Sequence, residues 1–325
     1  MFLPILLFII GLALLIKGGD FFVDGSVNIA HRFHLPELLI GATVVAIGTS
    51  FPELLVSSTA AFKGQAQTAY GNAVGSIICN TALVSALTVA IKPTETNRKN
   101  LILPTASFFI ALVFYCLIVY LMGEFTRLTG IILLTMFVIY IIISVRSTLK
   151  NREEPVELED EEHKKPTKLW MDILLILIGA AAIAIGAKLL VDNGTKIAAW
   201  MGVPESVIAL TFVALGTSLP ELVTAITSLA KGHSNLSLGN IIGANLFNLV
   251  LVCGMAITVR PFEIPTEKTF FDTGIAASYI VDIPVLITVM LILSIPPLIK
   301  GRMYRWQGIV LLLIYAAYCV YQFAL

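Results

Sequence analysis

Long apolar segments, separated by short polar ones, make up most of the chain. A helix needs about 20 predominantly apolar residues to cross the hydrocarbon core of a bilayer, and segments of that length recur from one end of the sequence to the other. We predict ten membrane-spanning helices, at residues 2–23, 37–62, 69–91, 101–121, 128–146, 169–190, 205–230, 236–258, 280–298 and 304–323. The hydropathy pattern therefore predicts an all-α integral membrane protein.

The composition agrees with this class of protein. Of the 325 residues, 58% are hydrophobic and 13% are charged, and the mean hydropathy is +0.92, whereas a soluble domain carries about 25% charged residues. The formal net charge of zero indicates no nucleic-acid partner. The four cysteines lie in apolar segments without the spacing of a disulfide framework or a metal site. The composition therefore predicts that the protein lies in a lipid bilayer. It does not predict an oligomeric state.

The distribution of Lys and Arg predicts the orientation in the membrane. One set of alternate loops carries fourteen of these residues and the opposite set carries six, and the richer set belongs in the cytoplasm. We therefore expect both termini outside the cytoplasmic membrane and the segment 147–168 inside. That segment holds seven acidic residues but lacks the glycine and alternating ligands of a calcium loop, so we interpret it as a charged linker.

The sequence repeats itself at an offset of 168 residues. The matched pairs include Gly48 with Gly216, Glu53 with Glu221, Gly71-Asn72 with Gly239-Asn240, Asn80 with Asn248, Asp24 with Asp192 and Pro93 with Pro261. The repeat divides the chain into residues 1–146 and 169–325, joined by 147–168. Each half has five predicted spans, an odd number, so the second half must enter the membrane in the opposite orientation. Such inverted repeats are common in secondary transporters, whose sites lie near the midplane at the repeat interface.

The best-matched polar segments are Gly48–Glu53, with the sequence GTSFPE, and Gly216–Glu221, with the sequence GTSLPE. Proline has no N–H and clashes with the carbonyl four residues earlier, so it opens a helix. We therefore expect free backbone carbonyls near Ala46 and Ile47 in the first half and near Ala214 and Leu215 in the second. Irregular backbone at membrane depth survives only where it is buried or lines an aqueous cavity.

Each of these segments also supplies side-chain oxygens. The carboxylates are Glu53 and Glu221, and the hydroxyls are those of Thr49, Ser50, Thr217 and Ser218. Hard cations such as Ca²⁺ bind about 6–8 oxygen ligands, and two facing carboxylates balance a divalent charge. An ionisable residue inside a membrane span indicates a functional site by default. We interpret the pair as a cation site rather than as an interhelical hydrogen bond.

A second helix in each half contributes amides. Ser76 and Asn80 share one helix face because they are four residues apart, and the matched residues of the second half are Ala244 and Asn248. The glycines on these helices can equally form a small-residue packing face. The two asparagines, in register with the carboxylates, favour an ion site.

The segments GTSFPE with GNAVGSIICN, and GTSLPE with GNIIGANLFN, resemble the two alpha-repeats of the cation/calcium exchanger superfamily, and most of all those of prokaryotic sodium/calcium exchangers. The resemblance implies ten helices in two inverted five-helix halves and a midplane site that binds Na⁺ and Ca²⁺ alternately. It further implies the first and sixth spans as the mobile helices. The implied ligands are Glu53, Glu221, Thr49, Ser50, Thr217, Ser218, Ser76, Asn80, Asn248 and the carbonyls of Ala46 and Ala214.

Two positions depart from the resemblance, because Ala244 lacks a hydroxyl that some relatives have and Asn248 stands where some carry Asp. The hypothesis is thus a secondary antiporter that exchanges Ca²⁺ for Na⁺, with Ca²⁺/H⁺ exchange through the same glutamates as the alternative. A passive channel is less favoured because the polar residues cluster at one depth. An enzyme is not favoured because no nucleophile–base set or nucleotide-binding motif is present, and no cofactor is predicted.

Overall fold

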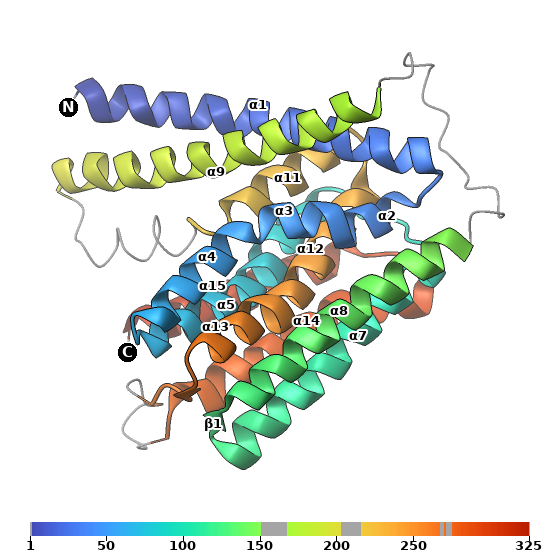
Figure 1. The fold of residues 1–325 in the computed structure, drawn as a ribbon. Coiled ribbons are helices and arrows are strands. Elements are labelled where there is room, and N and C mark those ends of the chain that lie inside the picture. Colours follow the sequence, from blue (N-terminus) through green and yellow to red (C-terminus); the bar gives the residue numbers. More distant parts are fainter. Residues whose placement is uncertain (1, 151–167, 203–215, 267–269, 271–274, 325) are drawn as a thin grey trace.

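The computed structural model describes residues 2–150, 168–202, 216–266, 270 and 275–324, and these are almost entirely helical (Figure 1). The first half contains α1 (Phe2–Phe33), α2 (Glu37–Ile40), η1 (Gly41–Val45), α3 (Ala46–Thr49), α4 (Phe51–Phe62), α5 (Ala66–Cys79), η2 (Asn80–Ser85), α6 (Ala86–Ile91), α7 (Arg98–Leu117), η3 (Ile118–Met122) and α8 (Arg127–Lys150). The second contains α9 (Leu169–Trp200), α11 (Leu219–Ala230), α12 (Ser234–Phe247), η6 (Asn248–Val252), α13 (Cys253–Val259), η8 (Ser278–Asp282), α14 (Ile283–Lys300) and α15 (Arg305–Ala324). The segments labelled η are π-helical turns. Two short strands, β1 (Glu124–Phe125) and β2 (Phe262–Glu263), form an antiparallel ribbon.

Seven helical stretches among the described residues are long and apolar enough to cross a membrane. The pair Glu37–Thr49 and Phe51–Phe62, bent by 45° at its break, makes an eighth if it counts as one span. Most of the first part of the predicted span 205–230 lies outside the described residues. The prediction of a helical, multi-pass membrane protein is confirmed at this level.

Helix bounds recur at the offset found in the sequence. Helices α4 and α11 begin 168 residues apart and end 168 residues apart, and so do α5 and α12. A π-helical turn follows each of the latter two, starting at Asn80 and at Asn248. The same local structure therefore forms twice from matched sequence.

Two predicted boundaries were wrong. Helices α1 and α9 end at Phe33 and Trp200, each ten residues beyond the predicted ends at 23 and 190. Polar residues in these extensions indicated the edge of the membrane, but an ordinary polar residue does not end a helix. The extensions lack the proline that would have ended them.

Helices α1 and α9 form an antiparallel pair that lies across the rest of the bundle (Figure 1). Glycines allow the two backbones to touch, since a Cβ built on Gly18 would lie 2.9 Å from the backbone nitrogen of Ile183. At one end of the pair the Arg32 guanidinium lies 2.9 Å from an Asp172 carboxylate oxygen, and Asn28 donates to the other oxygen at 3.1 Å. Because the Asp172 side chain is fully buried, this contact fixes one helix to the other.

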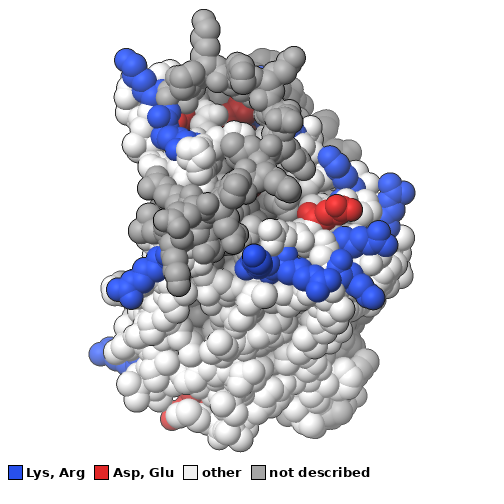
Figure 2. Space-filling model, turned by 90° about the vertical axis from the view of Figure 1, so that its right-hand side faces the viewer, with Lys and Arg blue, Asp and Glu red and all other residues white. Residues whose placement is uncertain are grey.

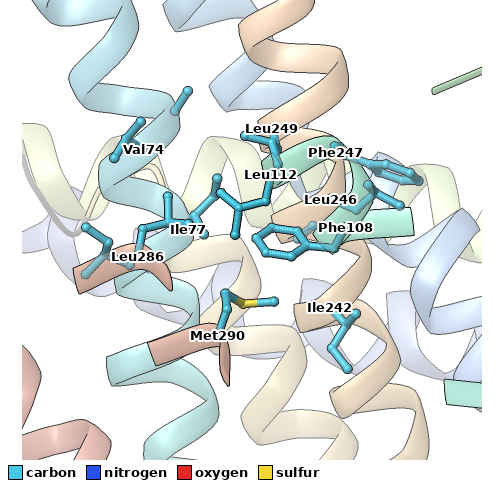
Figure 3. Packing of buried hydrophobic residues seen from close by; sticks show 14 of the residues in the cluster. Val74, Ile77, Phe108, Leu112, Ile242, Leu246, Phe247, Leu249, Leu286 and Met290 are labelled. Atoms are coloured by element: carbon cyan, nitrogen blue, oxygen red, sulfur yellow. The ribbon is translucent and has the colours of Figure 1, made fainter. Parts of the chain in front are cut away.

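The main hydrophobic core lies between α5, α7, α12 and α14. Figure 3 shows Ile77, Phe108, Ile242 and Met290 meeting there from these four helices. Neighbouring aromatic rings of Phe137 and Phe247 pack edge to face, with centroids 5.2 Å apart. This core supports the helices that carry Asn80 and Asn248.

Basic side chains gather on the face toward which α1 and α8 direct their C-terminal ends, as Figure 2 shows. On this side the loop after α6 is hydrogen-bonded to the loop after α14, with Thr96 N–H donating to the Gly301 carbonyl at 2.8 Å. It is the side that the Lys and Arg distribution predicts to be cytoplasmic.

We expect Gly179→Ala to destabilise the protein by weakening the α1–α9 pair. A Cβ there would lie 2.5 Å from the backbone nitrogen of Phe22, and overpacking of this kind costs about 1–3 kcal/mol. The control is Gly71→Ala in α5, where a Cβ meets no described atom within 4 Å and alanine favours the helix by about 0.5–1 kcal/mol. Thermal unfolding in detergent should show a lower midpoint for the first variant alone, and equal midpoints would contradict the close packing.

Candidate functional site

Both proline motifs start a new helix instead of interrupting one. Pro52 and Pro220 each occupy the first turn of their helices, α4 and α11, where the missing N–H costs no intrahelical bond. The serines before them have matching conformations, with φ −82° and ψ 3° at Ser50 and φ −88° and ψ 3° at Ser218. The bend in the second span therefore falls at Ser50.

The carbonyl of Ala46 is not free, contrary to the prediction, because it accepts the Ser50 N–H at 3.0 Å. The helix stays intact for one residue longer than the proline rule suggested, and the Thr49 hydroxyl also lies 3.4 Å from this carbonyl oxygen. The Gly48 carbonyl cannot receive its usual bond, since Pro52 has no N–H. Ala214 and Leu215 lie outside the described residues.

The two glutamates lie deep in the bundle and close to one another. Glu53 and Glu221 are each 0% exposed, and their carboxylates are near enough to interact electrostatically. The Ser50 hydroxyl, from the first half, donates to Glu221 Oε1 at 3.5 Å. The structure therefore brings the two motifs together.

Each glutamate helix also meets the π-helical turn of the other half. Helix α4, with Glu53, contacts η6, which begins at Asn248, and α11, with Glu221, contacts η2, which begins at Asn80. The small Gly243 lets α12 pack against η1, because a Cβ there would lie 2.6 Å from the Ala42 Cα. The amides and carboxylates are thus drawn from both halves.

Most of these buried groups lack a hydrogen-bond partner within the described protein. The unpartnered atoms include both carboxylate oxygens of Glu53, Glu221 Oε2, the Ser218 hydroxyl, and both amide atoms of Asn80 and of Asn248. Roughly 90% or more of buried polar groups in proteins are paired. So many unpaired oxygens in one place indicate a site that binds a ligand.

The remaining predicted ligands have mixed surroundings. Thr49 and Ser76 are buried and Thr217 is half-buried, whereas the fully buried Ala244 offers no polar side chain at the position matched to Ser76. No group of three or more His, Cys, Asp or Glu side chains suited to a metal occurs in the described ranges. A cation here would therefore be held by two carboxylates and neutral oxygens, a donor set that suits hard cations.

Two asparagines that the sequence analysis did not assign as site residues position the motifs. Asn240 accepts from the Thr49 hydroxyl at 3.1 Å and donates to the Thr224 hydroxyl at 3.2 Å, so it joins the halves. Asn72 donates to the Glu53 carbonyl at 3.2 Å and to the Ser57 hydroxyl at 2.8 Å. Their repetition in the matched Gly-Asn pairs was the available signal.

Comparison with known proteins agrees with this geometry. The sequence profile of the family described as sodium/calcium exchanger protein matches residues 3–146 and 171–324, and the chain belongs to that family. It is 30% identical to the sodium/calcium exchanger MaX1 of Methanosarcina acetivorans, over 98% of both chains. It is 33% identical to the inner membrane protein YrbG of Escherichia coli, over 81% of this chain and 82% of that protein. A solved structure of the sodium-calcium exchanger NCX_Mj superposes with a TM-score of 0.78 at 32% identity, covering 97% of each chain.

Family membership confirms several predictions. The chain is a membrane transporter of the cation/calcium exchanger superfamily rather than an enzyme, as the paired motifs predicted. Sodium and calcium are the ions of this family.

We expect Glu53→Gln to raise the thermal stability of the protein in cation-free alkaline buffer. A buried, unpartnered carboxylate costs more than a buried amide, and the amide also removes repulsion with Glu221. Addition of Ca²⁺ should stabilise the wild type, by about 2.7 kcal/mol at a hundred times Kd, and leave the variant unchanged. Glu124→Gln, at the exposed first residue of strand β1, is the control. An equal response to Ca²⁺ in both variants would exclude the buried carboxylate as a ligand.

Proposed function

We propose that the protein is a secondary antiporter that exchanges Ca²⁺ for Na⁺ by alternating access. The observation that carries this proposal is the group of fully buried, unpartnered oxygens on Glu53, Glu221, Asn80 and Asn248. It lies between two copies of one motif, in a chain that belongs to an exchanger family.

The proposed ligands surround the glutamate pair. Glu53 and Glu221 bind the ion centrally, and the other ligands are Thr49, Ser50, Thr217, Ser218, Ser76, Asn80, Asn248 and the carbonyls of Ala46 and Ala214. In this arrangement Asn240 orients the Thr49 hydroxyl, to which it is hydrogen-bonded.

The charge of the two carboxylates explains how this site could couple the two ion fluxes. Two carboxylates in a low-dielectric interior repel one another, and an uncompensated buried charge is costly. One Ca²⁺ or two monovalent ions neutralise the pair. The loaded site can therefore pass between its two access states, whereas the doubly charged site without an ion is held back, and this couples the two ion fluxes.

The proposed architecture is ten membrane helices in two inverted five-helix repeats, residues 1–146 and 169–325, joined by the charged linker 147–168. Support comes from the 168-residue offset of the helix bounds and from the matching backbone at Ser50 and Ser218. The basic face in Figure 2 supports an orientation in the cytoplasmic membrane with the linker inside and both termini outside.

Exchange of Ca²⁺ for H⁺ is the second candidate. It is favoured by the asymmetry between the buried Ser76 and Ala244, because the second half offers one hydroxyl fewer to a monovalent ion. Carboxylates can carry protons in place of sodium. A passive channel stays less favoured because the polar residues of the predicted spans cluster at one depth and do not line a continuous path.

The test is calcium uptake into vesicles that contain the purified protein. Vesicles loaded with Na⁺ and diluted into Na⁺-free medium should take up labelled Ca²⁺, and Glu53→Gln and Glu221→Gln should lower the rate at least tenfold, a loss of about 1.4 kcal/mol or more. Glu124→Gln, at an exposed acid, should leave uptake unchanged. Uptake that follows a pH gradient and ignores Na⁺ would replace the sodium assignment with the proton one. Uptake that persists in both glutamine variants would remove the site assignment.

We expect Ala244→Ser to strengthen the dependence on Na⁺. The new hydroxyl restores the oxygen that Ser76 provides in the first half and should lower the Na⁺ concentration for half-maximal uptake several-fold, as expected for one added ligand of about 1 kcal/mol. The control is Ala256→Ser, at an equally buried position in α13. An identical sodium dependence in both variants and the wild type would show that position 244 does not contact the ion.

A further inference from the structure

Two lysines at matched positions of the repeat have different surroundings. Lys231 directly follows α11, and its Nζ lies 2.9 Å from Asp24 Oδ1 and 3.3 Å from Asp20 Oδ1 on α1. It also donates to the Asp20 carbonyl at 3.2 Å. Lys63, which follows α4 at the matched position 168 residues earlier, is exposed and forms no ion pair with any residue that the structure describes.

The acidic partners of Lys231 have matched positions on α9. Asp24 corresponds to Asp192, and Asp20 corresponds to Lys188. Asp192 is not paired with Lys63. It is paired with Lys188 of its own helix, at 3.2 Å. Lys231 and Asp24 thus form an interhelical ion pair. The matched residues Lys63 and Asp192 do not form one.

The packing of the helices has the same asymmetry. Helix α1 packs along α11 so closely that a Cβ on Gly19 would lie 2.8 Å from the Thr227 hydroxyl oxygen. The matched helices α9 and α4 have no comparable contact, and in Figure 1 α11 lies beneath the α1–α9 pair while α4 runs away from it. The α1–α9 pair therefore packs against α11, the helix that carries Glu221, and not against α4, the helix that carries Glu53. We call α4 and α11 the motif helices.

Helices α1 and α9 are fixed to each other along their length. Their backbones touch at Gly18 and Gly179, and the buried Asp172 binds Arg32 and Asn28. Any movement relative to the motif helices α4 and α11 must then carry both together. A movement that draws α1 away from the end of α11 breaks the contacts of Lys231 with Asp20 and Asp24.

We propose that Lys231 and Lys63 set the relative stability of the two access states, by pairing with α1 in the state described here and with α9 in the opposite state. The proposal rests on the alternating access proposed above. In an inverted repeat, the opposite state arises when the halves exchange conformations. Lys63 then approaches Asp192 as Lys231 approaches Asp24.

The two pairings are unequal. Lys231 faces two acids, and although Lys17 lies 3.7 Å from Asp20, no other described lysine pairs with Asp24. Lys63 would face Asp192 alone, for which Lys188 competes at 3.2 Å. Single exposed ion pairs contribute little, but one lysine shared by two carboxylates and a carbonyl forms a network. Loss of Lys231 should therefore shift the population toward the opposite state, and loss of Lys63 should shift it the other way by less.

Distances between spin labels on α4 and α9 measure these populations. Labels at Thr59→Cys and Ile185→Cys, both exposed, are introduced after replacement of the four native cysteines by alanine. The full chain in vesicles should give a long distance for the present state and a shorter one for the opposite state. Lys231→Gln should raise the ratio of short to long distances about fivefold, as for a typical coupling between states, and Lys63→Gln, its matched control, should lower it.

A reversed pair checks that charge is responsible. Lys231→Asp combined with Asp24→Lys should return the ratio to that of the wild type. Equal ratios in Lys231→Gln, Lys63→Gln and the wild type, or shifts in one common direction, overturn the proposal. Calcium uptake by the same labelled protein separates the two proposals. Opposite shifts without sodium-driven uptake would support the lysine proposal and reject Ca²⁺/Na⁺ exchange. Sodium-driven uptake without opposite shifts would support Ca²⁺/Na⁺ exchange and reject the lysine proposal.

Discussion

Two carboxylates, Glu53 and Glu221, are held close together in the bundle with almost no hydrogen bonds from the residues that the structure describes. A bilayer offers no water to solvate them, so their charge has to be balanced inside the fold. Much of the surrounding structure serves this constraint. The prolines start new helices at the site, and each glutamate helix contacts the π-helical turn of the opposite half that begins with an asparagine.

The rest of the bundle makes this concentration of polar groups possible. The apolar core between α5, α7, α12 and α14 supports the helices that bear the amides. Small residues let α12 approach the bent second span and let α1 approach α9 and α11. Close packing elsewhere thus offsets the cost of site atoms that have no partner among the described residues.

Much of this could be predicted from the sequence, because bilayer length and hydropathy predict helices directly and because a repeated polar motif in an apolar segment is rare. The predicted ends of α1 and α9 were wrong, since polarity marks the edge of the membrane and not the end of a helix. The prediction of a free carbonyl at Ala46 was also wrong, because the Ser50 N–H still donates to it. The roles of Asn72 and Asn240 depend on which neighbour each amide meets, and spacing along the chain does not contain that information.

The sequence by itself determined that the chain crosses a membrane, that it is built of two matched halves, and that each half carries a carboxylate beside a proline. Those properties depend on residue type and period, which are local. Only the tertiary structure decided that Ser50 reaches Glu221 and that Asn240 joins the halves. It also decided that Lys231 is paired while Lys63 has no ion pair with a described residue. Matched sequences specify the same local structure twice, but packing around one common site places the two copies in different surroundings.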